Sequence, residues 1–95
     1  MKKEIENWLN LMETTDLPKG EGSFFDEDTG CYCALGLLCL ANNVAVVDEN
    51  GTGNWTYVQS LVRDYEVYRL NDENPYMPFK EMAQEIRNNS EGYVK

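Results

Sequence analysis

The chain has 95 residues, enough for one compact domain with one hydrophobic core over residues 1–95. Its 17 acidic and 8 basic side chains give a formal net charge of −9, so direct binding to nucleic acid or to a membrane is not expected. It has no histidine, the commonest general base and zinc ligand, which argues against most hydrolase and metalloenzyme mechanisms.

The first predicted element is a helix over residues 3–14. Four apolar side chains recur there at helical spacing and would share one face: Ile5, Trp8, Leu9 and Met12. Pro18 and Gly20 are expected to end this region. Residues 19–30 are polar, acidic and glycine-containing, which predicts an ordered loop whose Phe24-Phe25 pair supplies one aromatic anchor to the core.

The next segment is apolar on every side, with the sequence CYCALGLLCLA over residues 31–41. A helix of this composition is buried on nearly all faces, so we predict a central helix over about 30–42. Asp28 or Thr29 are candidate caps for its start. Gly36 costs a helix interior about 1 kcal/mol, which indicates that another backbone packs close to it.

Two runs of β-branched and aromatic residues follow, Val44–Val47 and Trp55–Val58, on either side of a segment that contains Asn50-Gly51. This pattern predicts a small antiparallel hairpin over about 44–58. The apolar spacing beyond it favours a short helix over 58–65, with a strand over 65–70 as the alternative.

A final helix is predicted to begin at Pro78, which suits a first helical position. Its apolar face would comprise Phe79, Met82, Ala83 and Ile86. The fold class expected from all these elements is α+β and mostly helical, with three or four helices around the central buried helix (about 30–42) and one small antiparallel hairpin (about 44–58).

Three cysteines are present, Cys31, Cys33 and Cys39, and buried structural thiols are the favoured interpretation. A zinc site needs four ligands, and no fourth cysteine or histidine is available. Only Cys31 lies near a predicted helix start, where a thiol could be activated as a nucleophile. The odd number of cysteines, without an export signal, predicts free thiols in a reducing cytoplasm.

Residues 48–53 resemble the opening of a calcium-binding loop, because Asp48 and Asn50 stand where oxygen ligands are required and Gly53 at the sixth place. The twelfth place is Gln59 instead of a bidentate glutamate, so a plain turn is favoured. The glycines form no phosphate-binding loop. We therefore predict no cofactor, no metal, no catalytic residue and no enzymatic activity.

The charge is unevenly distributed along the chain. Between residues 4 and 62 there are ten acidic side chains and a single basic one, Lys19. Such a field steers association toward a basic partner, although it could also serve only to keep the protein soluble. The acidic residues predicted to form a partner-binding surface are Asp16, Glu21, Asp26, Glu27, Asp28, Asp48 and Glu49.

Aromatic side chains are more numerous than so small a core is expected to absorb, although most could simply complete it. If exposed, some of them could stack on a nucleotide base while an arginine pairs with its phosphate. This alternative ligand-binding site would comprise Trp55, Tyr57, Arg63, Tyr68 and Arg69.

Three segments resemble a family of small uncharacterised phage-encoded proteins: Trp8-Leu9, the run from Gly30 to Cys39, and Leu70-Asn71-Asp72 leading to Phe79–Ile86. The family shares a tryptophan helix, a Tyr-Cys-Cys-Leu-Gly-Val-Leu-Cys-like segment and a Leu-Asn-Asp segment before Phe-x-Glu-Ile-Ala-x-x-Ile. This chain is a divergent match, because Ala34 follows Cys33 where the family has adjacent cysteines. The resemblance implies a phage origin and an intracellular role, and no catalytic residues.

The leading hypothesis is a phage accessory protein that acts by stoichiometric binding. Its acidic surface would mimic nucleic acid and occupy a basic nucleic-acid-binding surface of a host defence protein, such as a CRISPR or restriction protein, in the host cytoplasm. The alternative is a sponge that sequesters a small cyclic nucleotide signal in a pocket between subunits, which would require a homo-oligomer. We expect Asn71 and Asp72 to form a turn before the last helix.

Overall fold

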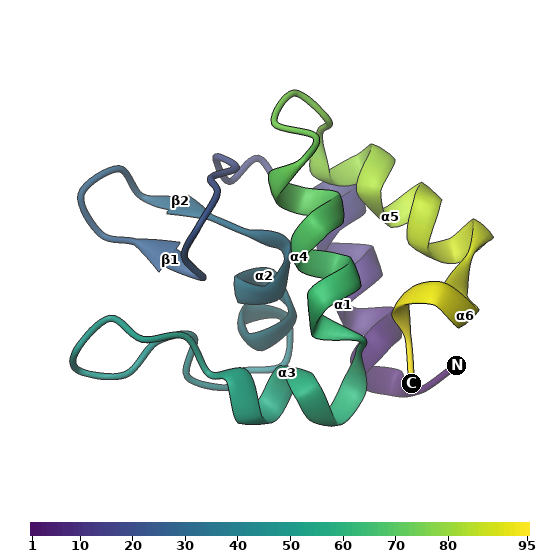
Figure 1. Ribbon diagram of the computed structural model, residues 1–95, viewed down its shortest axis with the longest axis horizontal. Coiled ribbons are helices and arrows are strands. Elements are labelled where there is room, and N and C mark those ends of the chain that lie inside the picture. The colour runs from purple at the N-terminus through teal and green to yellow at the C-terminus, as the bar shows by residue number, and fades with distance from the viewer.

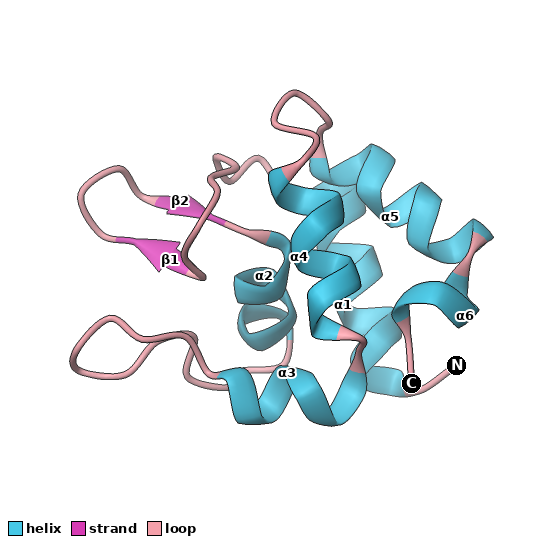
Figure 2. Cartoon of the chain, in the orientation of Figure 1, coloured by secondary structure: helices cyan, strands magenta, loops and turns pink.

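The computed structural model describes all 95 residues and contains six helices and one two-stranded sheet (Figures 1 and 2). In chain order the elements are α1 (Lys3–Thr14), β1 (Phe25–Asp26), β2 (Cys31–Tyr32), α2 (Ala34–Ala41), α3 (Trp55–Leu61), α4 (Asp64–Asp72), α5 (Phe79–Asn88) and α6 (Ser90–Tyr93). The predicted class, α+β and mostly helical, is confirmed. None of the helices combines the length and the apolar character needed to cross a membrane.

Helix α2 is the centre of the core, as its composition predicts. Its residues from Ala34 to Cys39 are all buried, and α1, α3 and α4 pack directly against it (Figure 1). Helix α5 packs against α1, and α6 lies between α5 and α4. The buried indole of Trp8 on α1 donates a hydrogen bond to the carbonyl oxygen of Ala34 at 2.8 Å, which fixes the first turn of α2.

The central helix begins later than predicted, at Ala34 instead of about residue 30. Cys31 and Tyr32 are extended because they form β2, which pairs antiparallel with β1. Tyr32 also exchanges backbone hydrogen bonds with Pro18 and Gly20. Neither Asp28 nor Thr29 caps the helix, because the amide of Ala34 is bound by a residue from a distant part of the chain, Asn71, at 3.0 Å.

The antiparallel hairpin exists, but it joins β1 to β2, and its predicted position over 44–58 is wrong. Only one isolated bridge, Val47 to Gly53, forms in that segment. The β-branched and aromatic residues from Trp55 onward are helical because Asn54 caps them. Its side-chain oxygen accepts a hydrogen bond from the amide of Tyr57 at 3.3 Å, which starts α3.

The predicted helix over 58–65 is replaced by two helices, α3 and α4, and the alternative strand over 65–70 is wrong. The break falls at Val62, which is extended and forms an isolated bridge with Val94 near the end of the chain. Asn71 and Asp72, expected in a turn, are the last two residues of α4.

The first and last predicted helices are confirmed. Helix α1 spans the predicted residues, and the four side chains of its expected apolar face are its buried ones. Helix α5 also buries the expected set, with Pro78 at the capping position just before the first helical residue. In both segments the apolar pattern extends over enough helical turns to determine that a helix forms and which of its faces is buried.

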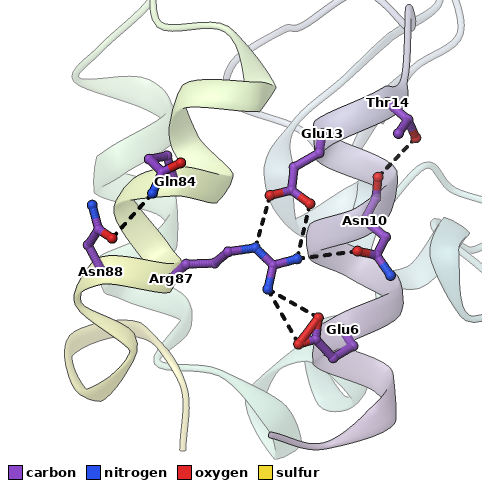
Figure 3. Close-up of polar contacts among 7 residues, drawn as sticks. All are labelled: Glu6, Asn10, Glu13, Thr14, Gln84, Arg87 and Asn88. Atoms are coloured by element: carbon purple, nitrogen blue, oxygen red, sulfur yellow. Dashed lines mark hydrogen bonds and ion pairs between the residues drawn. The ribbon is translucent and has the colours of Figure 1, made fainter.

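An arginine ties α5 to α1 (Figure 3). The Arg87 guanidinium donates to both carboxylate oxygens of Glu13 at 2.9 and 3.0 Å, and to Glu6 at 3.1 and 3.3 Å. Nη2, one of the two nitrogens that bind Glu13, also donates to the side-chain oxygen of Asn10 at 3.2 Å. The arginine side chain retains only 29% of its exposure, so this ion-pair network is better shielded than a single surface pair.

Arg87→Met is expected to destabilise the protein by about 1–2 kcal/mol at neutral pH, because bidentate arginine–carboxylate networks contribute more than isolated surface pairs. The hydrogen bonds from Arg87 lower the pKa of Glu13 below its usual value. Glu13 therefore contributes stability above the glutamate pKa of the unfolded chain, and this contribution is lost as the pH falls through the lowered pKa. Urea unfolding measures the difference in unfolding free energy between variant and wild type. This difference should become smaller as the pH is lowered from about 7 to about 3.

The matched control is Lys80→Met, which removes another cation of α5 that forms no ion pair. It is expected to change the unfolding free energy by less than about 0.5 kcal/mol. Equal losses in the two variants would contradict a specific role for the Arg87 network.

Candidate functional site

Four of the predicted acidic residues come together on one surface. The turn between β1 and β2 and the loop before α3 project from the same end of the molecule (Figure 1). Between them lies a shallow depression, here called the acidic hollow, whose charged lining is Asp26, Glu27, Asp48 and Glu49. Asp28 belongs to the same β1–β2 turn. Segments about twenty residues apart in sequence thus form one negatively charged surface.

Two aspartates hold the two loops in shape. The Asp26 carboxylate accepts a hydrogen bond from the amide of Asp28 at 2.9 Å. The Asp48 carboxylate accepts from the amides of Asn50 and Thr52 at 2.8 and 2.9 Å. Such side-chain bonds to nearby amides are typical of aspartate in turns. In the segment that resembles a calcium loop, the Asp48 side chain thus stabilises the turn itself.

The other acidic side chains of this end are unengaged. The carboxylates of Glu27, Asp28 and Glu49 are exposed and form no hydrogen bond or ion pair within the chain. No basic residue lines the acidic hollow. The negative charge of Glu27, Asp28 and Glu49 is therefore not neutralised by an ion pair within the chain.

Four acidic side chains elsewhere in the chain form ion pairs. Arg87 binds Glu6 and Glu13, and Arg69 pairs with Glu66 and Glu73 at 3.9 and 3.1 Å. None of these ion pairs involves a residue that lines the acidic hollow.

Two residues of the predicted acidic set lie outside the hollow. Asp16 lines a separate depression together with Lys19 and Lys80. Glu21 is exposed, and it is one of the charges that act on the ammonium group of Lys19. Asp16 and Glu21 therefore have basic neighbours, whereas the exposed carboxylates of Glu27, Asp28 and Glu49 form no ion pair.

A small cleft of about 10 Å³, with space for about one water molecule, lies beside the acidic hollow and is lined by two of the predicted ligand-binding aromatics, Trp55 and Tyr68. The Trp55 ring meets Phe24 edge-on, with ring centroids 4.8 Å apart. Trp55 is 38% exposed and Tyr68 41% exposed. Their rings are therefore accessible from solvent.

The remaining residues of that predicted ligand site are not brought into the cleft. Arg63 donates to the carbonyl oxygen of Glu91 at 3.1 Å, and Arg69 lies over the Tyr65 ring at 5.8 Å as well as in its ion pairs. Tyr57 is half-buried, and burial raises its pKa. The structure thus provides no aromatic and arginine pocket within one chain.

The charged group that does line the cleft is Asp72, which the sequence placed only in a turn. Its carboxylate accepts a hydrogen bond from the side chain of Asn71 at 2.8 Å and has no ion-pair partner. The sequence marks Asp72 only as part of the Leu70-Asn71-Asp72 segment of the family resemblance, which gives no indication of a cleft. The fold of a distant loop over α4 was needed to place it in a cleft.

The three cysteines are free thiols. Cys33 and Cys39 are buried, and this burial raises the pKa of each thiol to about 11. Both thiols therefore stay protonated near neutral pH and are poor nucleophiles. Cys31 is half-buried in β2, and no group of three metal-binding side chains forms around any cysteine.

The chain was compared with protein-family models, with curated proteins and with solved structures, and none of them matches it.

Proposed function

We propose that this protein acts by stoichiometric binding, with the acidic hollow and the neighbouring β1–β2 turn occupying a basic, nucleic-acid-binding surface of a host protein. The observation that carries this proposal is the gathering of acidic side chains from two loops around one depression that no basic residue lines. A protein surface that binds nucleic-acid phosphates carries several arginine and lysine side chains, which would complement these carboxylates.

The geometry suits recognition of charge. Aspartates fix the two loops through bonds to their own amides, so the exposed carboxylates of Glu27, Asp28 and Glu49 lie on an ordered surface. Ordered charges lose less conformational entropy on binding than charges on a mobile tail. They also raise the association rate with an oppositely charged partner, in a way that salt weakens.

The biological setting of the proposal comes from the resemblance to small phage-encoded proteins. A phage protein that works in the host cytoplasm by blocking a nucleic-acid-binding surface would act on a defence protein, such as a CRISPR effector or a restriction nuclease. The nucleotide-sponge alternative receives less support, because Arg63 and Arg69 are engaged outside the aromatic cleft.

The test is a competition assay in which the protein displaces labelled DNA from candidate effectors, read by fluorescence anisotropy over a salt series. The variant Glu27→Lys, Asp28→Lys, Glu49→Lys reverses three charges without removing any hydrogen bond. We expect it to weaken binding by at least about tenfold, and we expect wild-type affinity to fall as salt rises.

The control is Glu4→Lys, Glu81→Lys, Glu91→Lys, which makes the same change in net charge at exposed positions away from the two loops. It should retain most of the wild-type affinity. Equal weakening by the two triple variants, or affinity that does not depend on salt, would contradict a localised nucleic-acid-mimicking surface.

A further inference from the structure

Three exposed aromatic side chains lie near one another on α3 and α4. Trp55, the first residue of α3, and Tyr68 on α4 line the same small cleft. Tyr65 stands three residues before Tyr68 on α4, a spacing that makes two side chains neighbours on a helix surface, and it is 65% exposed. We call Trp55, Tyr65 and Tyr68 the aromatic patch.

The cleft between Trp55 and Tyr68 barely interrupts this patch. It has space for about one water molecule, so no side chain of a partner can enter it. Its wall includes the buried side chains of Phe24 and Leu35, and the Phe24 ring holds the Trp55 ring edge-on. A partner would therefore contact the exposed parts of the rings as one shallow aromatic surface.

The aromatic patch is continuous with the acidic surface. Ser23 lines both the small cleft and the acidic hollow, and Trp55 also lines a depression that shares Val47 and Asp48 with the hollow. A stable protein interface takes about 20–30 residues from each side, whereas nine residues line the acidic hollow. A partner seated on the hollow must therefore extend over neighbouring surface, and the aromatic patch adjoins it.

The charges around the aromatic patch favour a basic partner. No basic residue lines the small cleft or the acidic hollow. Arg69 lies over the Tyr65 ring, but its charge is paired with Glu66 and Glu73. Rings next to unpaired carboxylates reproduce the two features that single-stranded nucleic acid offers to a protein, which are negative charge and the flat faces of unpaired bases.

We propose that the aromatic patch takes the place of unpaired bases, and that the partner is a protein surface that binds single-stranded nucleic acid. Such surfaces combine a positively charged groove with aromatic side chains on which bases stack. A surface that binds only the phosphates of a duplex needs no such rings. The inference rests on the proposed function, because the acidic hollow supplies the attraction to a basic partner and the aromatic patch specifies its class.

The first test measures whether the protein prefers aromatic over aliphatic side chains in a basic ligand. The probes are two peptides of equal length and charge, three repeats of Lys-Phe-Lys and three repeats of Lys-Leu-Lys. Trp8 is fully buried, so quenching of tryptophan fluorescence by acrylamide reports on Trp55. The phenylalanine peptide should bind about three- to tenfold more tightly and should shield Trp55, because aromatic pairs gain affinity beyond the area that they bury.

The variant Tyr65→Leu, Tyr68→Leu removes two rings and keeps apolar side chains of good helix propensity. It should bring the two peptide affinities to parity. Tyr76→Leu is the control, because Tyr76 is 96% exposed and lines neither the small cleft nor the acidic hollow. It should leave the preference for the phenylalanine peptide intact. Equal affinities of the wild type for the two peptides would overturn the inference.

The outcomes separate this inference from the proposed function. The triple-lysine variant of the acidic loops should weaken the binding of both peptides and preserve their affinity ratio. If the double leucine variant keeps the wild-type ratio, the base-like role of the aromatic patch is wrong while the acidic surface stands. If that ratio falls to parity but the triple-lysine variant binds as wild type does, the proposed function fails and the aromatic patch stands.

The second test applies the competition assay to the class of partner. Wild type should displace a labelled single-stranded oligonucleotide from its partner, and the double leucine variant should do so at least about threefold less effectively. A partner that loses only duplex DNA to this protein would contradict the inference and leave the acidic surface in place.

Discussion

Gly36→Ala is expected to destabilise the protein by about 2–3 kcal/mol, although alanine is the better helix former by about 1 kcal/mol. A Cβ atom at Gly36 would overlap the carbonyl oxygen of Phe24 and lie 2.9 Å from its carbonyl carbon. That carbonyl oxygen also accepts a hydrogen bond from the amide of Cys33 at 3.2 Å, so the backbone on both sides is fixed. Relieving the overlap requires the loop to move off the central helix.

Chemical denaturation measures this loss, and Gly92→Ala is the control, since no atom lies within 4 Å of a Cβ at that helical position. The control should be neutral or slightly stabilising. Because Phe24 supports the Trp55 ring, Gly36→Ala should also shift the tryptophan fluorescence of the folded protein. A Gly36→Ala protein as stable as wild type would mean that the close approach is not present in solution.

The elements that the sequence predicts correctly are those determined by local periodicity. Helix α1 and helix α5 each show an apolar face over two or more turns, and burial follows that face. The close backbone contact at Gly36 is likewise confirmed, because an interior helical glycine needs a packing reason. The anchoring aromatic of the acidic loop is confirmed as Phe24, which is 3% exposed.

The errors arise where distant groups override local preference. Residues 31–32 are extended because Pro18 and Gly20 pair with Tyr32, a contact that no local pattern contains. The second half of the predicted hairpin is helical because one asparagine, Asn54, caps it against the β-propensity of the segment.

The candidate site shows the same division between local and distant information. The excess of acidic residues is visible in the sequence, but the sequence does not show which of them lie together and which lie beside basic residues. Asp16 lies with Lys19 and Lys80, whereas Glu27 and Glu49 come together from two loops. The position of Asp72 in the cleft depends on the packing of α4 against the chain before β1, so spacing alone could not predict it.

Asn71 is the only buried polar residue and joins three parts of the core. Its side-chain oxygen accepts from the amide of Ala34 at 3.0 Å and thereby caps α2, which has no cap of its own. Its side-chain nitrogen donates to the carbonyl oxygen of Gly20 at 2.9 Å. Every buried side-chain polar atom has a partner in this structure, so removing Asn71 would leave backbone groups unpaired in the core.

Asn71→Ala is therefore expected to destabilise the protein by about 2–4 kcal/mol, the sum of a lost helix cap and an unsatisfied carbonyl. Urea unfolding monitored by circular dichroism measures this loss. Asn74→Ala is the matched control, because the Asn74 side chain donates only one local bond, to the carbonyl oxygen of Leu70 at 3.0 Å. It should cost less than about 1 kcal/mol. Similar small losses in both variants would show that α2 does not depend on a cap from α4, since water would then be satisfying the amide of Ala34 in place of Asn71.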